Sequence, residues 1–157
     1  MWGAIVDKIK TTIYVYNQAS RYFIGFSLKI LVAEDEAEIR QMYKIVLESE
    51  GHEVHMAEDG GECMEIYKNV LDESTEIGTP AFDLIILDHR MPKKTGLEVA
   101  NQVLGICPAQ EILMITAYGG ELDLTDNLNK MKIIRKPFEI DELISFLRNL
   151  AGKAIIQ

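Results

Sequence analysis

The sequence predicts an α/β protein in a single domain: a doubly wound, five-stranded parallel sheet with helices on both faces. Short, uninterrupted apolar runs such as Leu84–Leu87 are typical of strands buried on both faces, as in a parallel sheet. These runs alternate along the chain with longer stretches whose apolar residues recur at helical spacing. With 157 residues, the chain has the size of one domain with a substantial core.

The first strand is predicted at Lys29–Ala33, where the apolar run is closed by three consecutive acids, Glu34-Asp35-Glu36. A helix follows and stops at Gly51, a residue typical of helix C-termini. Its apolar face comprises Ile39, Met42, Tyr43, Val46 and Leu47. The second strand is predicted at Val54–Ala57.

Residues 63–71 have the spacing of a second helix, in which Cys63 fits the role of a small buried hydrophobe. A polar loop over residues 72–80 leads to the third strand, Leu84–Leu87, which ends on Asp88. Residues just past the end of such a strand lie where open α/β sheets bind ligands. Asp88 is therefore a candidate for chemistry, although an Asp before a turn can also simply hydrogen-bond its own loop.

The later part of the chain continues the alternation of strands and helices, which is typical of a parallel sheet covered by helices on both faces. In order, the sequence predicts a helix over 97–104 ended by Gly105 and Pro108, a strand over 112–115 that stops at Thr116, a weakly patterned helix over 121–131, a strand over 132–134, and a helix over 140–150.

Residues 1–28 differ from the rest of the chain. They carry three basic and one acidic side chain, whereas residues 29–157 carry 13 basic and 24 acidic ones. Apolar residues recur there near helical spacing, which indicates an amphipathic helix able to lie on a membrane surface or a partner. The alternative is a start-site artefact, with the natural protein beginning near Leu28. We therefore divide the chain into an extension over 1–28, a domain over 29–151 and a tail over 152–157.

The net charge of −9 argues against direct nucleic-acid binding, because an acidic body repels phosphate backbones. The two cysteines lie far apart and lack metal-ligand spacing, so no disulfide framework is expected and a cytoplasmic location fits. No apolar run is long enough for a membrane-spanning helix.

Polar residues follow four of the predicted strands: Glu34 and Asp35, then Asp88, Thr116 and Lys136. In a parallel sheet all five project toward one edge. Three carboxylates held close together favour a neutralising cation, and oxygen ligands beside a phosphate suit Mg²⁺. Lys136 adds a positive charge and Thr116 a hydroxyl donor, so this edge suits a phosphoryl group. Asp88 is then the candidate acceptor, forming an acyl phosphate.

Residues 29–151 resemble a response-regulator receiver domain, the phosphoacceptor part of two-component signalling, similar to stand-alone chemotaxis-type regulators. The resemblance rests on four motifs in this order: Glu34-Asp35, Leu87-Asp88 followed by Met91-Pro92 and Gly96, Thr116-Ala117, and Lys136-Pro137-Phe138. It implies a flavodoxin-like sheet, a cis Lys136-Pro137 bond, and a phosphoryl group accepted by Asp88 from a histidine kinase or phosphotransfer protein.

The resemblance also implies how the other residues act. Lys136 would hold a phosphoryl oxygen, and Thr116 would move toward it after transfer, changing the affinity for a downstream protein partner. Mg²⁺ would be bound by Asp35, Asp88, Glu34 through water, and the main-chain carbonyl of Arg90. Since no output domain follows in this sequence, we expect a switch, phosphate sink or phosphorelay intermediate that does not itself bind DNA.

Two departures from the family pattern bear on the switch. Ile133 stands where many receivers have an aromatic residue that reports the switch. Arg90 and Tyr118 stand where side chains tune the lifetime of the phosphate, and their size favours slow dephosphorylation.

Other interpretations of these motifs exist. Glu34-Asp35-Glu36 also suits a helix N-terminus, Thr116 a helix cap, and Lys136-Pro137 an ordinary turn. An aspartate-nucleophile phosphatase would usually place a second acid at Arg90, which argues against an enzyme. A nucleotide- or flavin-binding module would need a glycine-rich loop where Glu34 stands.

Overall fold

The computed structural model describes residues 27–73, 78–117 and 131–155. Five parallel strands form one sheet in the order β2-β1-β3-β4-β5. The strands are β1 (Lys29–Ala33), β2 (Glu53–Ala57), β3 (Leu84–Asp88), β4 (Ile112–Thr116) and β5 (Lys132–Arg135), and the described helices are α2 (Ala37–Ser49), α3 (Gly60–Glu73), α4 (Gly96–Ile106) and α5 (Ile140–Ile155). This strand order is the flavodoxin-like one, so the predicted fold class is confirmed.

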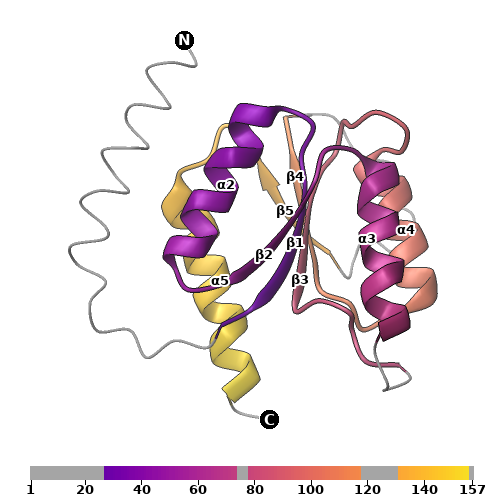
Figure 1. Ribbon diagram of the computed structural model, residues 1–157. Helices are drawn as coiled ribbons and strands as arrows, with labels where there is room; N and C mark the ends of the chain where they lie inside the picture. The colour runs from indigo at the N-terminus through magenta and orange to yellow at the C-terminus, as the bar shows by residue number, and fades with distance from the viewer. Residues whose placement is uncertain (1–26, 74–77, 118–130, 156–157) are drawn as a thin grey trace.

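Helices cover both faces of the sheet, with α2 and α5 on one side and α3 and α4 on the other (Figure 1). Side chains of β1 alternate between the two cores: Ile30 and Val32 join the cluster under α2 and α5, and Leu31 and Ala33 join the cluster under α3 and α4. All residues of β3 and β4 are buried in the same way. The uninterrupted apolar runs are explained by this double burial, which stabilises the fold by about 1.5–3 kcal/mol for each large aliphatic side chain.

The elements predicted within the described residues are present, and several of their ends differ by one to three residues, as in α3, which begins at Gly60 and not near Cys63. Two further differences lie at the ends of α4 and α5. Gly105 lies inside α4, which ends at Ile106, because a glycine weakens a helix without necessarily stopping it. The last helix continues to Ile155, past the expected end of the domain at Ala151.

Some sequence predictions fall on parts of the chain that the structure does not describe. These are residues 1–26 of the extension, nearly all of the expected helix over 121–131, and Tyr118. Leu28 is described and is 4% exposed in the core under α2 and α5. Its N–H donates to His52 Nδ1 at 3.3 Å, so the packed body includes this residue.

None of the helices within the described part of the chain has the length and apolar content needed to cross a membrane.

Candidate functional site

The central strands β1 and β3 are neighbours, but the helices that follow them leave for opposite faces of the sheet (Figure 1). A crevice forms at such a switch point, beyond the carboxyl ends of the strands. Glu34 and Asp35 follow β1, and Asp88 is the last residue of β3. One carboxylate oxygen from each of the three lies within 4.8 Å of the others, so the predicted acids meet at this edge.

Lys136 inserts its ammonium group between two of these acids. Its Nζ lies 3.2 Å from Glu34 Oε2 and 3.2 Å from Asp88 Oδ1. The Lys136 main-chain N–H donates to the Thr116 carbonyl at 2.7 Å, which extends the pairing of β5 with β4 by one step. The Lys136–Pro137 peptide bond is cis, as predicted.

Glu34 is the most deeply buried of the acids, at 1% exposure. Burial raises the pKa of its carboxyl to about 7, with Asp88 adding to the rise and the Lys136 charge and the Glu36 N–H opposing it. Burial lowers the pKa of Lys136, but the Glu34 and Asp88 carboxylates raise it by more, so the net direction is upward. Lys136 therefore stays protonated at neutral pH, while the Glu34 carboxyl can lose its proton to solvent when a cation binds.

The backbone at and just after Asp88 is fixed by hydrogen bonds and by the close approach of Gly96. Asp88 is 8% exposed, and a methyl group on Gly96 would overlap its carbonyl oxygen, so only glycine fits that position. The Gly96 N–H donates to the His89 carbonyl and the His89 N–H donates to the Ile115 carbonyl, each at 3.0 Å. The loop after β3 thus folds back onto the strand end.

Thr116 and Arg90 lie on the same edge as the acids. Thr116 ends β4 next to β3 and is 2% exposed, while Arg90 is exposed two residues after Asp88. Ile133, at the position often aromatic in receivers, is half-buried on β5 in register with Met114.

Arg40 is a residue that the sequence analysis missed. From the first turns of α2, its Nη1 donates to the carbonyl oxygens of Glu34 at 2.7 Å and Asp35 at 3.1 Å. It therefore holds the backbone of the loop that carries two of the acids. In the sequence, Arg40 is visible only as an arginine about one helical turn after an acidic pair. That pattern alone does not predict hydrogen bonds to the backbone of the pair.

Three side chains on the apolar faces of the predicted helices are buried in the structure. Tyr43 and Tyr67 are buried, and so is Cys63, where burial raises the pKa of the thiol to about 12. Burial, with Glu34 and Asp88 adding to it, also moves the pKa of Tyr43 far above its usual range. None of these three groups is an acid or base at neutral pH.

The three carboxylates have the chemistry of a divalent-cation site. They offer hard oxygen donors, and the partly exposed rim at Asp35 leaves room for water, which Mg²⁺ retains in most protein sites. Among the described residues, this is the one group of three or more His, Cys, Asp or Glu side chains close enough to share an ion. The donor set fits Mg²⁺.

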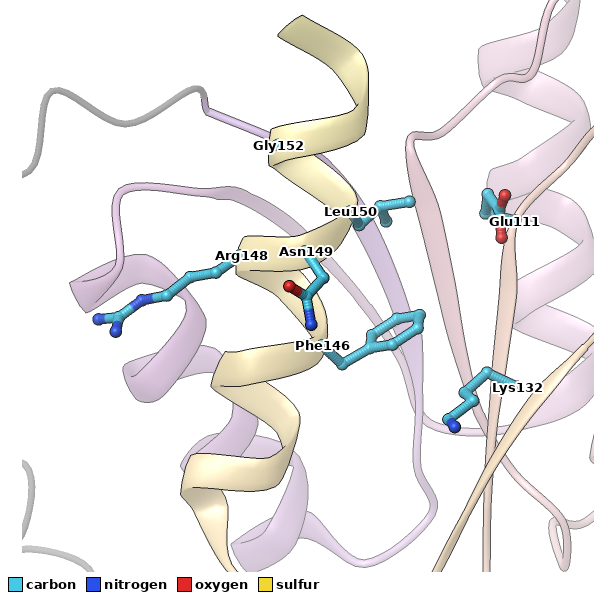
Figure 2. A pocket seen from close by; sticks show the side chains of 7 residues that line it. All are labelled: Glu111, Lys132, Phe146, Arg148, Asn149, Leu150 and Gly152. Carbon is cyan, nitrogen blue, oxygen red and sulfur yellow. The ribbon is translucent and has the colours of Figure 1, made fainter. Parts of the chain in front are cut away.

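A separate hollow of about 650 Å³ lies along α5, far from the acids in the fold. Figure 2 shows Phe146 of α5 directed toward the sheet, near Lys132. The hollow is lined by Glu111, Lys132, Phe146, Arg148, Asn149, Leu150 and Gly152. Glu111 and Lys132 stand at the amino ends of β4 and β5, so this hollow is at the edge of the sheet opposite the site.

Comparison with known proteins agrees with this geometry. The family model described as "Response regulator receiver domain" matches residues 30–148. The transcriptional regulatory protein CpxR of Escherichia coli is 34% identical over 128 residues, which are 80% of this chain and 50% of CpxR. The chain spans about half the length of the curated relatives it matches.

Two solved structures are similar in both sequence and shape. The response regulator protein TrrA of Thermotoga maritima, crystallised in complex with Mg²⁺-BeF, has a TM-score of 0.63 at 33% identity, over 77% of this chain and 96% of TrrA. The chemotaxis protein CheY4 of Vibrio cholerae has a TM-score of 0.64 at 27% identity, over 80% of this chain and 99% of CheY4.

Proposed function

Because the chain belongs to the response regulator receiver domain family, we propose that Asp88 accepts a phosphoryl group from a histidine kinase or phosphotransfer protein and that the change switches the affinity for a protein partner. The observation that carries the assignment to Asp88 is its contact with a cation within a cluster of two further acids. Its Oδ1 contacts Lys136 Nζ at 3.2 Å, and its carboxylate groups with Glu34 and Asp35 within 4.8 Å.

In the proposed reaction, a carboxylate oxygen of Asp88 forms a bond to phosphorus while the bond from phosphorus to the donor's leaving atom breaks. The product is an acyl phosphate on Asp88, and the leaving nitrogen of a phosphohistidine donor takes up a proton. Lys136 remains protonated and is positioned to hold a phosphoryl oxygen. Its ammonium group stabilises the negative charge on the transferring group.

Mg²⁺, when bound, would offset the charge of the acids and of the incoming phosphoryl group. We assign its binding to Asp35 and Asp88 directly, to Glu34 through water, and to the main-chain carbonyl of Arg90. The presence of Mg²⁺-BeF with the similar protein TrrA supports this assignment, as does the oxygen-only donor set.

For the output, we propose that Thr116 moves toward the phosphoryl group and that a separate protein partner reads the change. Ile133 gives this switch a smaller side chain than the aromatic residue found in many receivers. The curated relatives are named transcriptional regulators, and their length leaves room for a second, output part. A phosphate sink or relay intermediate uses the same chemistry and differs only in its partners.

We propose that the chain is not an enzyme and that it acts in the cytoplasm. The position two residues after Asp88, where an aspartate-based phosphatase carries its general acid, holds Arg90. A guanidinium group holds its protons too tightly to act as a general acid toward a leaving group.

The test is phosphorylation by acetyl phosphate, followed by mass spectrometry of the intact protein. With Mg²⁺ we expect one added phosphoryl group, and with excess chelator almost none. The donor is anionic, and without the metal the three acids repel it. Equal labelling in the two conditions would contradict the proposed metal-dependent mechanism.

A further inference from the structure

The loop between β3 and α4, residues 89–95, carries the Arg90 carbonyl and is fixed at both ends. At its start the His89 N–H donates to the Ile115 carbonyl, and Met91 is 8% exposed in the core under α3 and α4. At its end Thr95 caps α4 in a reciprocal capping box with Glu98. Between these ends, the Lys94 N–H donates to the Pro92 carbonyl at 2.7 Å, a bond within the loop itself.

Lys93, in the middle of this loop, has a φ of 64°, in the left-handed region that residues other than glycine rarely adopt. Its Nζ lies 2.6 Å from Asp59 Oδ2, in the loop between β2 and α3. Asp59 is 5% exposed, and its other oxygen, Oδ1, accepts the Glu62 N–H at 2.9 Å, which caps α3. Asp59, which is held in place by its hydrogen bond to the start of α3, therefore binds the Lys93 ammonium group.

The two loops also touch through their backbones. A methyl group on Gly60 would overlap the Lys94 carbonyl oxygen, so the start of α3, where the loop after β2 ends, lies directly against the loop after β3. Neither Asp59 nor Lys93 belongs to the acidic cluster of Glu34, Asp35 and Asp88. Any influence they have on that cluster passes through the loop.

We propose that Asp59 and Lys93 are positioning residues: their ion pair holds the middle of the loop over residues 89–95, and through it the Arg90 carbonyl, in the geometry that Mg²⁺-dependent phosphoryl transfer at Asp88 requires. This inference rests on the proposed function. Without the pair, the loop stays attached at His89 and Thr95, but Lys93 loses the contact that offsets its unfavourable φ.

Charge and position predict opposite effects of removing Lys93, which makes the proposal testable. If Lys93 acted only through its charge, its removal would take away a cation near the acids and tighten Mg²⁺ binding. If it acts by positioning, its removal weakens Mg²⁺ binding.

The experiment compares three single variants of the full chain and the double variant Asp59→Asn/Lys93→Gln. Lys93→Gln removes the ion pair. Lys94→Gln is the matched control, with the same change of charge at the next residue, whose ammonium group has no acid within 4.0 Å among the described residues. Asp59→Asn keeps an N-cap side chain on α3 but removes the partner charge. Mg²⁺ affinity is measured by calorimetry, and exchange of the Lys94 and Gly96 amide hydrogens by NMR without metal.

We expect Lys93→Gln and Asp59→Asn each to raise the Mg²⁺ dissociation constant and to speed exchange of the two amides by roughly threefold, the factor expected from an ion pair of ordinary strength. The double variant should be no worse than either single one, because both remove the same contact. Lys94→Gln should leave exchange unchanged and Mg²⁺ binding equal or slightly tighter.

The proposal is overturned if Lys93→Gln behaves like Lys94→Gln, or if amide exchange changes while Mg²⁺ affinity does not. The wild-type protein separates this failure from that of the proposed function. If it neither binds Mg²⁺ nor accepts phosphate, the function itself is wrong, and the metal-free exchange experiment still decides whether the pair holds the loop.

Discussion

The two ends of β3 carry the same type of residue in contrasting surroundings. Asp83, just before the strand, is exposed, and its Oδ2 accepts the Lys29 N–H at 2.7 Å. Asp88, at the other end, is 8% exposed and contacts Lys136 within the acidic cluster. The residue type is the same and both residues flank the same apolar run, so the difference in chemistry arises from which edge of the sheet each residue occupies.

Two glutamates on neighbouring strands repeat the contrast. Burial raises the pKa of Glu34, after β1, to about 7. Glu53, at the start of β2, is exposed, and its pKa is lowered chiefly by the hydrogen bond from His55, whose Nε2 lies 2.8 Å away. At the carboxyl edge, loops from several strands converge and bury Glu34 and Asp88, while Asp35 stays exposed at the rim. At the amino edge the same groups remain solvated.

The largest effect that this comparison predicts concerns the two aspartates of β3. Asp88→Asn should abolish phosphorylation by acetyl phosphate, because an amide is not a nucleophile for phosphorus under these conditions. Asp83→Asn should label like the wild type, since the amide oxygen can still accept the Lys29 N–H. Intact-protein mass spectrometry with Mg²⁺ measures both. Persistent labelling of Asp88→Asn would place the acceptor elsewhere.

The second prediction compares exposed acids at the two edges. Asp35→Ala should raise the Mg²⁺ dissociation constant at least about tenfold, on the scale of losing a metal-site group, with the melting temperature nearly unchanged. Glu53→Ala removes the same charge at the opposite edge and should leave Mg²⁺ affinity unchanged. Calorimetric titration measures the affinities. Equal losses in the two variants would mean that overall charge, not position, controls the metal.

Much of this contrast between the two edges was predictable from the sequence, because the end of a strand is marked there by the end of an apolar run. The apolar run over Leu84–Leu87 stops at a charge, and parallel connections place Asp88, Glu34 and Lys136 at one edge whatever the details of packing. Periodicity and topology thus sufficed for the fold and for the main candidate residues of the site.

The contacts between loops were not predictable in the same way. Arg40 reaches the Glu34 and Asp35 carbonyls, and Lys93 reaches Asp59, 34 positions away, through geometry that no local pattern encodes. The positive φ of Lys93 is also invisible in the sequence, since glycine is the usual signal for it. Such contacts depend on how two loops meet after the sheet has formed.

A third prediction uses the pH dependence of Glu34. Its folded-state pKa of about 7 lies above the ordinary glutamate pKa of 4.5, so the folded protein binds this proton more tightly than the unfolded chain does. The contribution to stability is therefore fully present below pH 4.5 and is lost as the pH rises through 7. Between pH 8 and pH 6, metal-free wild type should gain on the order of 1 kcal/mol relative to Glu34→Gln.

Urea unfolding at the two pH values measures this difference. Referring the wild type to Glu34→Gln cancels the contribution of His52, whose pKa is lowered by burial. The variant Glu53→Gln, at the solvated edge, should keep the wild-type gain. Saturating Mg²⁺ should reduce the gain, because the cation favours the ionised carboxylate. A gain of the same size in Glu34→Gln would show that another group is responsible.

The smallest effect is expected at the amino edge, where the extension joins the sheet. Deleting residues 1–27 should change the melting temperature by less than about 2 °C and leave Mg²⁺ affinity and phosphorylation unchanged. The packed body includes Leu28, and the extension enters at the edge opposite the acids, with a basic composition unlike that of the acidic domain.

As a positive control, Leu28→Ala in the full chain should cost roughly 2 kcal/mol, because this side chain is buried under α2 and α5. Differential scanning calorimetry of the two proteins separates the cases: a large loss of stability on deletion would mean that the extension packs into the domain and that the contrast between the two edges is incomplete.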